Sequence, residues 1–282
     1  MRKIALIGGD CRQIHAAATL QEAGFLPFVF GNDGAAKEGF TAPYTLKETL
    51  ADAEAALLPV PSVKKKGFLH TPLSEGSVSL TALTQAMPQN TAVFLWGAKN
   101  CPLPDSLRVV DLEKDEQLQT ENALLTAEAA ICLAMQHAKH SFGGARVAVV
   151  GYGRIGRALC HLATALGAEV TVTAREGKSK ELARRAGFSL ASPEKTALFA
   201  ETDLIFNTVP APILAKNCFL GMPRHLLYLE LASKPGGLMP DAATLLGQKV
   251  IDGAGLPGKF FPFDAGRRLA EAVLRHLEVG SC

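Results

Sequence analysis

Three glycines at a fixed spacing are the residues of this sequence best suited to bind a ligand. They lie in the run Gly151-Tyr152-Gly153-Arg154-Ile155-Gly156, between the apolar stretch 147–150 and a helical stretch at 154–166. In that context the first glycine permits a tight turn, the second lets backbone approach a pyrophosphate, and the third lets the helix pack closely on the sheet. The N–H groups and the positive end of the helix dipole favour phosphates. The run therefore predicts a dinucleotide-binding site.

The residues after the next strand bear on which dinucleotide binds. NAD-binding proteins usually place Asp or Glu there to accept from the ribose 2′-hydroxyl. Here Ala174 stands in that place, and Arg175 and Lys178 offer cations suited to a 2′-phosphate. Glu176 keeps NAD(H) open as the alternative. We expect Ala174, Arg175 and Lys178 to line the adenosine end, with NADP as the cofactor.

Three later loops follow strand-like stretches, where a doubly wound sheet places its ligand. They cover residues 207–210, 232–237 and 255–259, and they are rich in small side chains and prolines. Such loops give rigid walls and exposed backbone groups, although each alone is also ordinary turn chemistry. We expect the nicotinamide end to contact Asn207, Thr208, Val209, Pro210, Ala232, Ser233, Gly255, Leu256 and Pro257.

The elements that position these residues are repeated in the chain. Residues 3–9 and 146–151 both read as a short apolar strand that runs into glycine. We therefore predict an α/β protein with two doubly wound parallel-sheet domains, the second a Rossmann dinucleotide-binding domain, joined by a long helix. In the first copy, Asp10 stands where Gly153 stands in the second, and Gln13 replaces Gly156. A carboxylate there would repel a pyrophosphate, so we expect the first domain to serve the substrate.

The domain limits follow from glycines and helical spacing. We predict an N-terminal, flavodoxin- or Rossmann-like substrate or partner domain at 1–118 and a connecting helix at 119–142. The NADP-binding Rossmann domain covers 143–262, and a C-terminal helix at 263–282 packs back on the first domain. The expected strands after the first one are 54–58, 91–95, 107–112, 146–150, 169–174, 203–206, 225–231 and 248–251.

Composition excludes several classes of function. The formal charge is +2, from 29 basic and 27 acidic residues, which gives no case for nucleic acid or a membrane surface as partner. The six cysteines form no CxxC pair, so we expect no metal site and a reduced, cytoplasmic protein. We find no Ser/His/Asp arrangement and no P-loop. The segment 255–263 lacks the histidine that a 2-hydroxy acid dehydrogenase would need.

Beyond the glycine run, a set of motifs covers nearly the whole chain. The motifs are Ile7-Gly8-Gly9-Asp10 with Arg12-Gln13, Leu58-Pro59-Val60, Thr126-Ala127-Glu128-Ala129-Ala130, Ala134-Met135-Gln136-His137, Val150-Gly151-Tyr152-Gly153-Arg154, Asn207-Thr208-Val209-Pro210, Leu231-Ala232-Ser233-Lys234-Pro235-Gly236-Gly237 and Gly255-Leu256-Pro257-Gly258. Together they resemble the family of dipicolinate synthase A subunits of endospore-forming bacteria. The sequence departs from that family pattern at Ala129, where we expect glycine, and at 259–263.

The resemblance implies a sporulation enzyme that oxidises dihydrodipicolinate, or its hydrated precursor, to dipicolinate with NADP⁺. It also implies the B subunit of dipicolinate synthase as a partner, an oligomer, and the cytoplasm of the mother cell of a spore-forming bacterium. Two alternatives stay open. One is another NADP-linked oxidoreductase of a small carboxylate, and the other is a nucleotide-sensing subunit without catalysis.

A small dicarboxylate substrate requires cations or N–H groups. Arg12 is our first candidate for binding a carboxylate, and Lys99 and Lys234 are the next candidates. A proton must also leave the ring, and Asp10 or Glu128 is placed in that catalytic role. Glu128 has a second interpretation, in which it orients Arg12 or a backbone amide.

Overall fold

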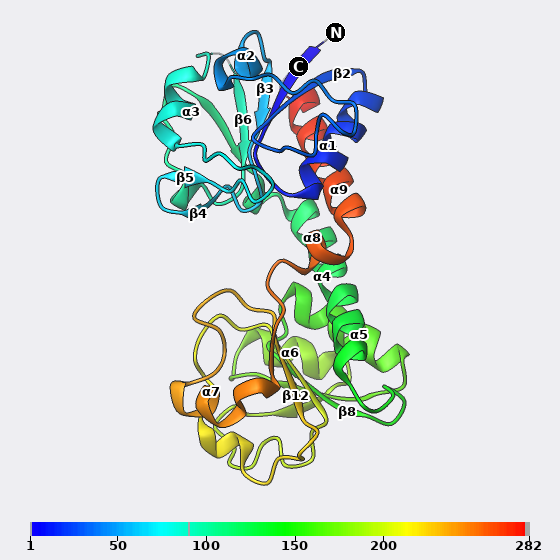
Figure 1. Ribbon diagram of the computed structural model, residues 1–282. Coiled ribbons are helices and arrows are strands. Elements are labelled where there is room, and N and C mark those ends of the chain that lie inside the picture. Colours follow the sequence, from blue (N-terminus) through cyan, green and yellow to red (C-terminus); the bar gives the residue numbers. More distant parts are fainter. Residues whose placement is uncertain (1, 90, 280–282) are drawn as a thin grey trace. The chain divides into compact units, whose positions relative to one another are not determined.

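The chain folds into two compact units in the computed structural model, which describes residues 2–89 and 91–279. Unit 1 comprises the described residues up to Glu121 together with those from Gly258 onward. Unit 2 comprises Asn122–Pro257. Figure 1 shows each unit as a sheet flanked by helices.

Unit 1 is built on a parallel sheet with the strand order β2-β1-β3-β6-β7. Counted along the chain, this is the order 2-1-3-4-5 of the flavodoxin-like doubly wound fold, whose switch point lies between β1 and β3. The strands are β1 (Arg2–Ile7), β2 (Phe25–Phe30), β3 (Ala55–Leu57), β6 (Ala92–Leu95) and β7 (Arg108–Asp111), with a separate hairpin of β4 (Val63–Lys65) and β5 (Phe68–Leu69). The helices are α1 (Cys11–Glu22), α2 (Leu46–Leu50), α3 (Leu80–Ala86) and α9 (Pro262–Val279), with 3-10 turns at Ala98–Asn100 and Leu112–Lys114.

The side chains of β1 point alternately to the two faces of the sheet, and each face carries its own hydrophobic core. Ile4 and Leu6 are buried in a cluster with residues of α1 and α9, such as Leu20. Ala5 and Ile7 are buried on the opposite face, in a cluster with residues of α2 and α3. Successive side chains of a strand point to opposite faces, so the continuous apolar run of β1 is what a sheet covered on both faces requires.

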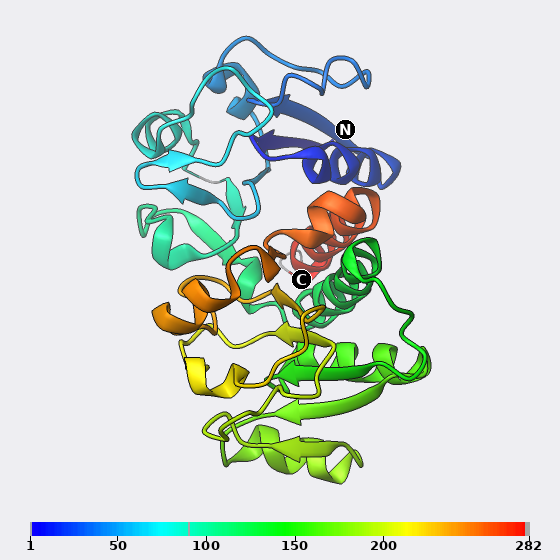
Figure 2. The same cartoon turned by 60° about the horizontal axis from the view of Figure 1, so that its bottom comes forward.

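Helix α9 comes from the far end of the chain and packs against α1, and Figures 1 and 2 both draw the two helices side by side. Gly266 makes the close approach possible. A Cβ at that position would lie 2.7 Å from His15 Cβ and 3.0 Å from the Ala16 nitrogen. The last helix is thus part of the core of unit 1.

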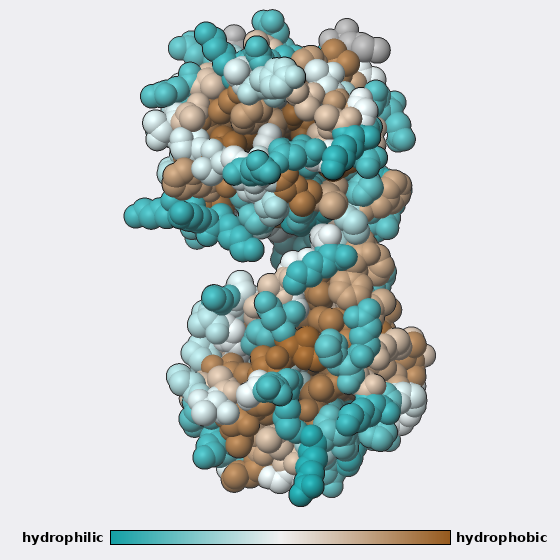
Figure 3. Space-filling model, viewed as in Figure 1, coloured by the Kyte–Doolittle hydropathy of each residue, from teal (hydrophilic) through white to brown (hydrophobic). Residues whose placement is uncertain are grey.

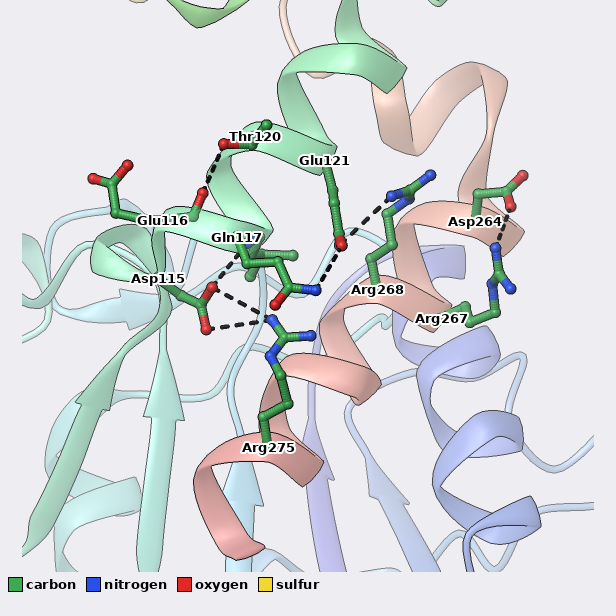
Figure 4. Close-up of polar contacts among 10 residues, drawn as sticks. Asp115, Glu116, Gln117, Thr120, Glu121, Asp264, Arg267, Arg268 and Arg275 are labelled. Atoms are coloured by element: carbon green, nitrogen blue, oxygen red, sulfur yellow. Dashed lines mark hydrogen bonds and ion pairs between the residues drawn. The ribbon is translucent and has the colours of Figure 1, made fainter. Parts of the chain in front are cut away.

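The long helix α4 (Glu116–His137) begins in unit 1, where ion pairs join it to α9 (Figure 4). Asp115 accepts a hydrogen bond from the Leu118 amide at 2.8 Å, which caps the helix. The same carboxylate lies 3.4 Å from the Arg275 guanidinium and 3.0 Å from His276 Nε2. One turn further on, Glu121 lies 3.5 Å from Arg268. These contacts tie the start of α4 to the last helix.

Unit 2 is built on a parallel sheet with the order β10-β9-β8-β11-β12-β13. This is the 3-2-1-4-5-6 order of the Rossmann fold, so the expected fold class is confirmed. The strands are β8 (Arg146–Val150), β9 (Glu169–Thr173), β10 (Ser189–Ala191), β11 (Leu204–Asn207), β12 (Leu227–Glu230) and β13 (Val250–Asp252). The helices are α5 (Arg154–Ala165), α6 (Lys178–Arg185) and α7 (Pro240–Leu246), with 3-10 turns at Lys216–Phe219 and Gly247–Lys249, and α8 (Leu256–Phe260) follows β13.

The structure corrects the expected loop at 255–259. Residues 256–260 form the short helix α8, in which Leu256 and Pro257 occupy the first turn. Proline is tolerated there because the N–H groups of the first turn have no partner within the helix. Gly255 precedes the helix with φ +68° and makes the turn into it.

No helix among the described residues has an apolar stretch long enough to cross a membrane. On the face drawn in Figure 3, hydrophilic side chains are scattered over both units.

Candidate active site

The glycine turn of unit 2 leads from β8 into α5 at the switch point between β8 and β11. Gly151 has φ +92°, and a Cβ there would lie 2.6 Å from Thr208 Oγ1 and 2.7 Å from Val209 Cγ2. A Cβ on Gly156 would collide with the Gly151 carbonyl oxygen. The first and third glycines are therefore required by packing: one admits the loop after β11, and the other lets α5 approach the turn.

Gly153 differs from the other two glycines because a side chain at its position would have room. A Cβ there would meet nothing within 4 Å among the described residues. Gly153 is also the N-cap of α5, and in the described part of the chain no side chain caps this helix. Its positive dipole end thus faces open space, which is the arrangement that binds a phosphate group. The predicted phosphate turn fits a dinucleotide.

Tyr152 contributes to this turn through its backbone. Its side chain is buried, and its ring centroid lies 5.8 Å from that of Phe188. Burial raises the pKa of the Tyr152 hydroxyl. The next residues along the run, Arg154 and Ile155, form the first turn of α5.

The adenosine end predicted from sequence lies at the carboxyl end of β9. Ala174 is buried, and its amide donates to the Ala191 carbonyl at 3.2 Å. Arg175 and Lys178 are exposed. Glu176, the residue that kept NAD(H) open, forms an ion pair with Lys180. The carboxylate that could accept from a ribose hydroxyl is thus engaged with a lysine.

The loop after β11 packs directly on the glycine turn. Thr208 donates from its hydroxyl to the Val150 carbonyl at 2.8 Å, and its amide donates to the same oxygen at 2.9 Å. Asn207 is fully buried, and its side-chain amide donates to the Val209 carbonyl at 3.0 Å. Pro210 follows and is exposed. This loop therefore borders the glycine turn, and its contact with the nicotinamide stays a prediction.

The loop that follows β12 is the next part of the predicted nicotinamide site. Ala232 donates its amide hydrogen to Glu230 at 3.1 Å, and Ser233 is exposed beside it. Sequence reasoning missed Glu230, although it carries the hydrogen bonds of this loop. A lone glutamate at the end of an expected strand gives no signal that donors from two loops converge on it.

Two of the predicted catalytic residues meet at the switch point of unit 1. Asp10 is the N-cap of α1, and its carboxylate accepts from Arg12 Nε at 2.9 Å and from an Arg12 terminal nitrogen at 2.8 Å. Arg12 also donates to the Val60 carbonyl, on the loop that follows β3. The Arg12 side chain is only 11% exposed. The pair thus joins the loops after β1 and β3, and Arg12 is largely committed to protein partners.

Gly258 and His70 complete this cluster. A Cβ on Gly258 would lie 2.9 Å from Arg12 Nε and 3.0 Å from Asp10 Oδ2, so backbone covers the ion pair. Burial opposes ionisation, but the hydrogen bonds and charge of Arg12 lower the pKa of Asp10 below its usual value. Burial, aided by the charge of Lys64, lowers the pKa of the His70 imidazole. Sequence reasoning did not place His70 beside Asp10.

The other predicted substrate residues lie on different elements. Glu128 is exposed on the part of α4 that belongs to unit 2. Lys99 is exposed in a 3-10 turn of unit 1, and Lys234 is exposed in the loop after β12. Of the cations proposed for the carboxylates, the structure therefore pairs only Arg12 with Asp10 among the described residues.

Comparisons with known proteins agree with this geometry. Residues 3–109 match the family described as the N-terminal domain of the dipicolinate synthase A subunit. Residues 110–219 match the D-isomer specific 2-hydroxyacid dehydrogenase, NAD binding domain. This second match supports a dehydrogenase-type domain for a nicotinamide dinucleotide, and so an oxidoreductase.

Relatives match over nearly the whole length of the chain. The dipicolinate synthase A subunit of Bacillus subtilis (strain 168) is 31% identical over 98% of this chain and 95% of its own. The crystal structure of the A subunit from Bacillus halodurans has a TM-score of 0.82 at 29% identity, covering 98% of this chain and 97% of that one. The crystal structure of the Bacillus subtilis protein gives 0.82 at 28% identity, with 98% and 96% covered. The chain belongs to the family of dipicolinate synthase A subunits.

Proposed function

We propose that this chain oxidises dihydrodipicolinate to dipicolinate with NADP⁺. The substrate loses a hydride and a proton, and the ring becomes an aromatic pyridine that keeps both carboxylates. The dinucleotide, when bound, supplies the hydride acceptor. Because aromatisation favours product, the protein's task is to hold the donor carbon in line and to accept the proton.

The observation that carries the proposal is the uncapped start of α5 at Gly153, in a member of this family. Its open N-terminus suits a diphosphate, and the turn is braced by Thr208 on the loop after β11. The choice of NADP⁺ over NAD⁺ is supported by Ala174, by the exposed Arg175 and Lys178, and by the ion pair that engages Glu176.

On the substrate side, we assign one carboxylate of the substrate to the Arg12 guanidinium, which has five N–H donors and gives three hydrogen bonds to Asp10 and Val60. Asp10 orients Arg12 through a two-pronged ion pair, which fixes the plane of the guanidinium. The lowered pKa of Asp10 makes it a weak base, whereas the lowered pKa of His70 keeps that imidazole neutral near neutral pH. His70 therefore joins Glu128 as a candidate acceptor of the ring proton.

The test of the proposed function is formation of reduced nicotinamide, followed by its absorbance, with dihydrodipicolinate and either NADP⁺ or NAD⁺. We expect turnover with NADP⁺ by the full chain. Saturable nucleotide binding without turnover, with or without a second subunit, would instead favour a sensor.

Arg12→Ala tests whether Arg12 binds a carboxylate of the substrate. Wild-type catalytic efficiency in that variant would remove Arg12 from the carboxylate site.

We also propose the B subunit of dipicolinate synthase as a partner, because the relatives are named as one subunit of a synthase. Size-exclusion chromatography of this chain with the B subunit should give an earlier peak than either protein alone. Separate elution at all mixing ratios would contradict the partnership.

A further inference from the structure

Glu230, the last residue of β12, receives an unusual number of hydrogen bonds for one half-buried carboxylate. Its Oε1 accepts from Asn207 Nδ2 at 2.6 Å and from the Ala232 amide at 3.1 Å. Its Oε2 accepts from the Gly237 amide at 2.9 Å and from the Tyr228 hydroxyl at 3.2 Å. Both oxygens therefore have two donors each.

These donors come from two separate loops as well as from β12 itself. Asn207 ends β11, and it is held in turn by Val209, whose amide donates to Asn207 Oδ1 at 3.2 Å. Ala232 and Gly237 begin and end the loop after β12. One carboxylate thus fixes the loop at 207–210 and the loop at 232–237 relative to each other.

The backbone has closed onto this carboxylate so tightly that only glycine fits. A Cβ on Gly236 would lie 2.7 Å from Glu230 Oε2. A Cβ on Gly237 would lie 2.5 Å from Asn207 Cγ. The two glycines of the run Pro235-Gly236-Gly237 are therefore explained by contact with Glu230 and its partner, and they need no contact with a ligand.

We propose that Glu230 is a positioning residue for the nicotinamide half of the dinucleotide, an inference that rests on the proposed function. The two loops that it joins follow β11 and β12, on the side of the switch point away from β9, where Arg175 lies. A dinucleotide whose pyrophosphate sits on the turn at 151–156 and whose adenosine lies toward β9 extends its nicotinamide toward these loops. Glu230 sets the shape of that wall from behind.

The chemistry requires a carboxylate at this position. An amide is isosteric, but its NH₂ group would face two donors whichever way it is turned, because each oxygen of Glu230 has two. Burial, with the nearby charge of Glu230, raises the pKa of Tyr228, so its hydroxyl keeps its proton and remains a donor. Glu230→Gln should therefore release at least one loop while the fold of the sheet persists.

The experiment compares NADP⁺ with adenosine 2′,5′-bisphosphate, which lacks the nicotinamide half, by calorimetric titration of the full chain. For Glu230→Gln we expect NADP⁺ to bind about tenfold more weakly and kcat to fall, with affinity for the bisphosphate unchanged. Tyr228→Phe, which deletes one donor and keeps the ring, should shift NADP⁺ affinity in the same direction by about threefold. Glu201→Gln is the matched control, because Glu201 is 83% exposed and pairs with Arg146 at the other end of β8.

The possible outcomes distinguish a failure of the role of Glu230 from a failure of the proposed function. Wild-type affinity and kcat in Glu230→Gln would overturn the role of Glu230 alone. An equal loss of affinity for both nucleotides would also overturn it, because the residue would then support the whole unit. A wild-type protein that does not bind NADP⁺ would overturn the proposed function, and the role of Glu230 with it.

Discussion

Asp10 and Gly153 occupy the same place in their two units, as the residue before the helix that follows the first strand. Their backbones are nearly the same, with φ −93° and ψ −163° at Asp10 and φ −79° and ψ −162° at Gly153. In unit 1 the side chain caps α1 and holds Arg12. In unit 2 the missing side chain leaves the start of α5 open. At this position the residue type therefore distinguishes a turn suited to phosphate from one that is filled by its own carboxylate.

Arg175 is the residue through which the proposed preference for NADP⁺ can be tested. Arg175→Ala should weaken NADP⁺ binding about tenfold and leave NAD⁺ binding unchanged, because only NADP⁺ carries the 2′-phosphate that a guanidinium would bind. Calorimetric titration of each nucleotide measures both values. Arg184→Ala is the control, since Arg184 is paired with Glu181 on α6. Equal changes for the two nucleotides would contradict a 2′-phosphate site at Arg175.

At the scale of elements, the contact between α1 and α9 depends on Gly266. Gly266→Ala should lower the free energy of unfolding by about 1–3 kcal/mol, because the new Cβ would overpack against His15 and Ala16. Denaturant unfolding measures the difference. Gly76→Ala is the matched control in unit 1, where a Cβ would meet only Ser74 Oγ at 3.8 Å. Equal stability of the two variants would show that α9 does not pack closely on α1.

Much of the fold could be predicted because its strands are short apolar runs, and because β1 and β8 run directly into glycine. The expected strands at 146–150 and 169–174 correspond to β8 and β9, and the expected helix at 154–166 corresponds to α5. Short elements escaped this reasoning. β10 has only three residues with one large apolar side chain, and α8 begins with a leucine and a proline that read equally well as a turn.

The candidate site was only partly predictable, for a different physical reason. The glycine turn consists of consecutive residues, so its conformation can be predicted from their order alone. The network at Glu230 joins residues 207, 228, 232 and 237, which come together only when the sheet has formed. The same holds for Arg12, which sequence presents as a free cation and the structure pairs with Asp10 and Val60.

At the scale of the whole molecule, three aspartates should limit stability in acid. Burial opposes ionisation of Asp10, Asp115 and Asp203, yet hydrogen bonds and nearby cations lower the pKa of each below its usual value. A lowered pKa contributes stability above the unfolded value of about 3.9, and that stability is lost as pH falls through the folded value. We therefore expect the melting temperature to drop as the pH falls below about 4.

Asp115→Asn checks the contribution of one aspartate. The variant should melt lower at neutral pH, because it loses its ion pair to Arg275 and alters its hydrogen bond with His276, and its melting temperature should fall less steeply in acid. Asp105→Asn, at an exposed position, is the control and should follow the wild type. An acid profile of Asp115→Asn parallel to the wild type would show that this carboxylate contributes nothing to the pH dependence.

The most direct test of the account is calorimetric titration of the wild type and of Gly153→Asp with NADP⁺. Aspartate is compatible with the backbone of Gly153 and is a favourable N-cap, so the variant should keep its melting temperature. Its carboxylate would occupy the start of α5 and repel the pyrophosphate. The account predicts saturable heat from the wild type and none from the variant. Heat from neither NADP⁺ nor NAD⁺ with the wild type, or equal affinity in the variant, would contradict it.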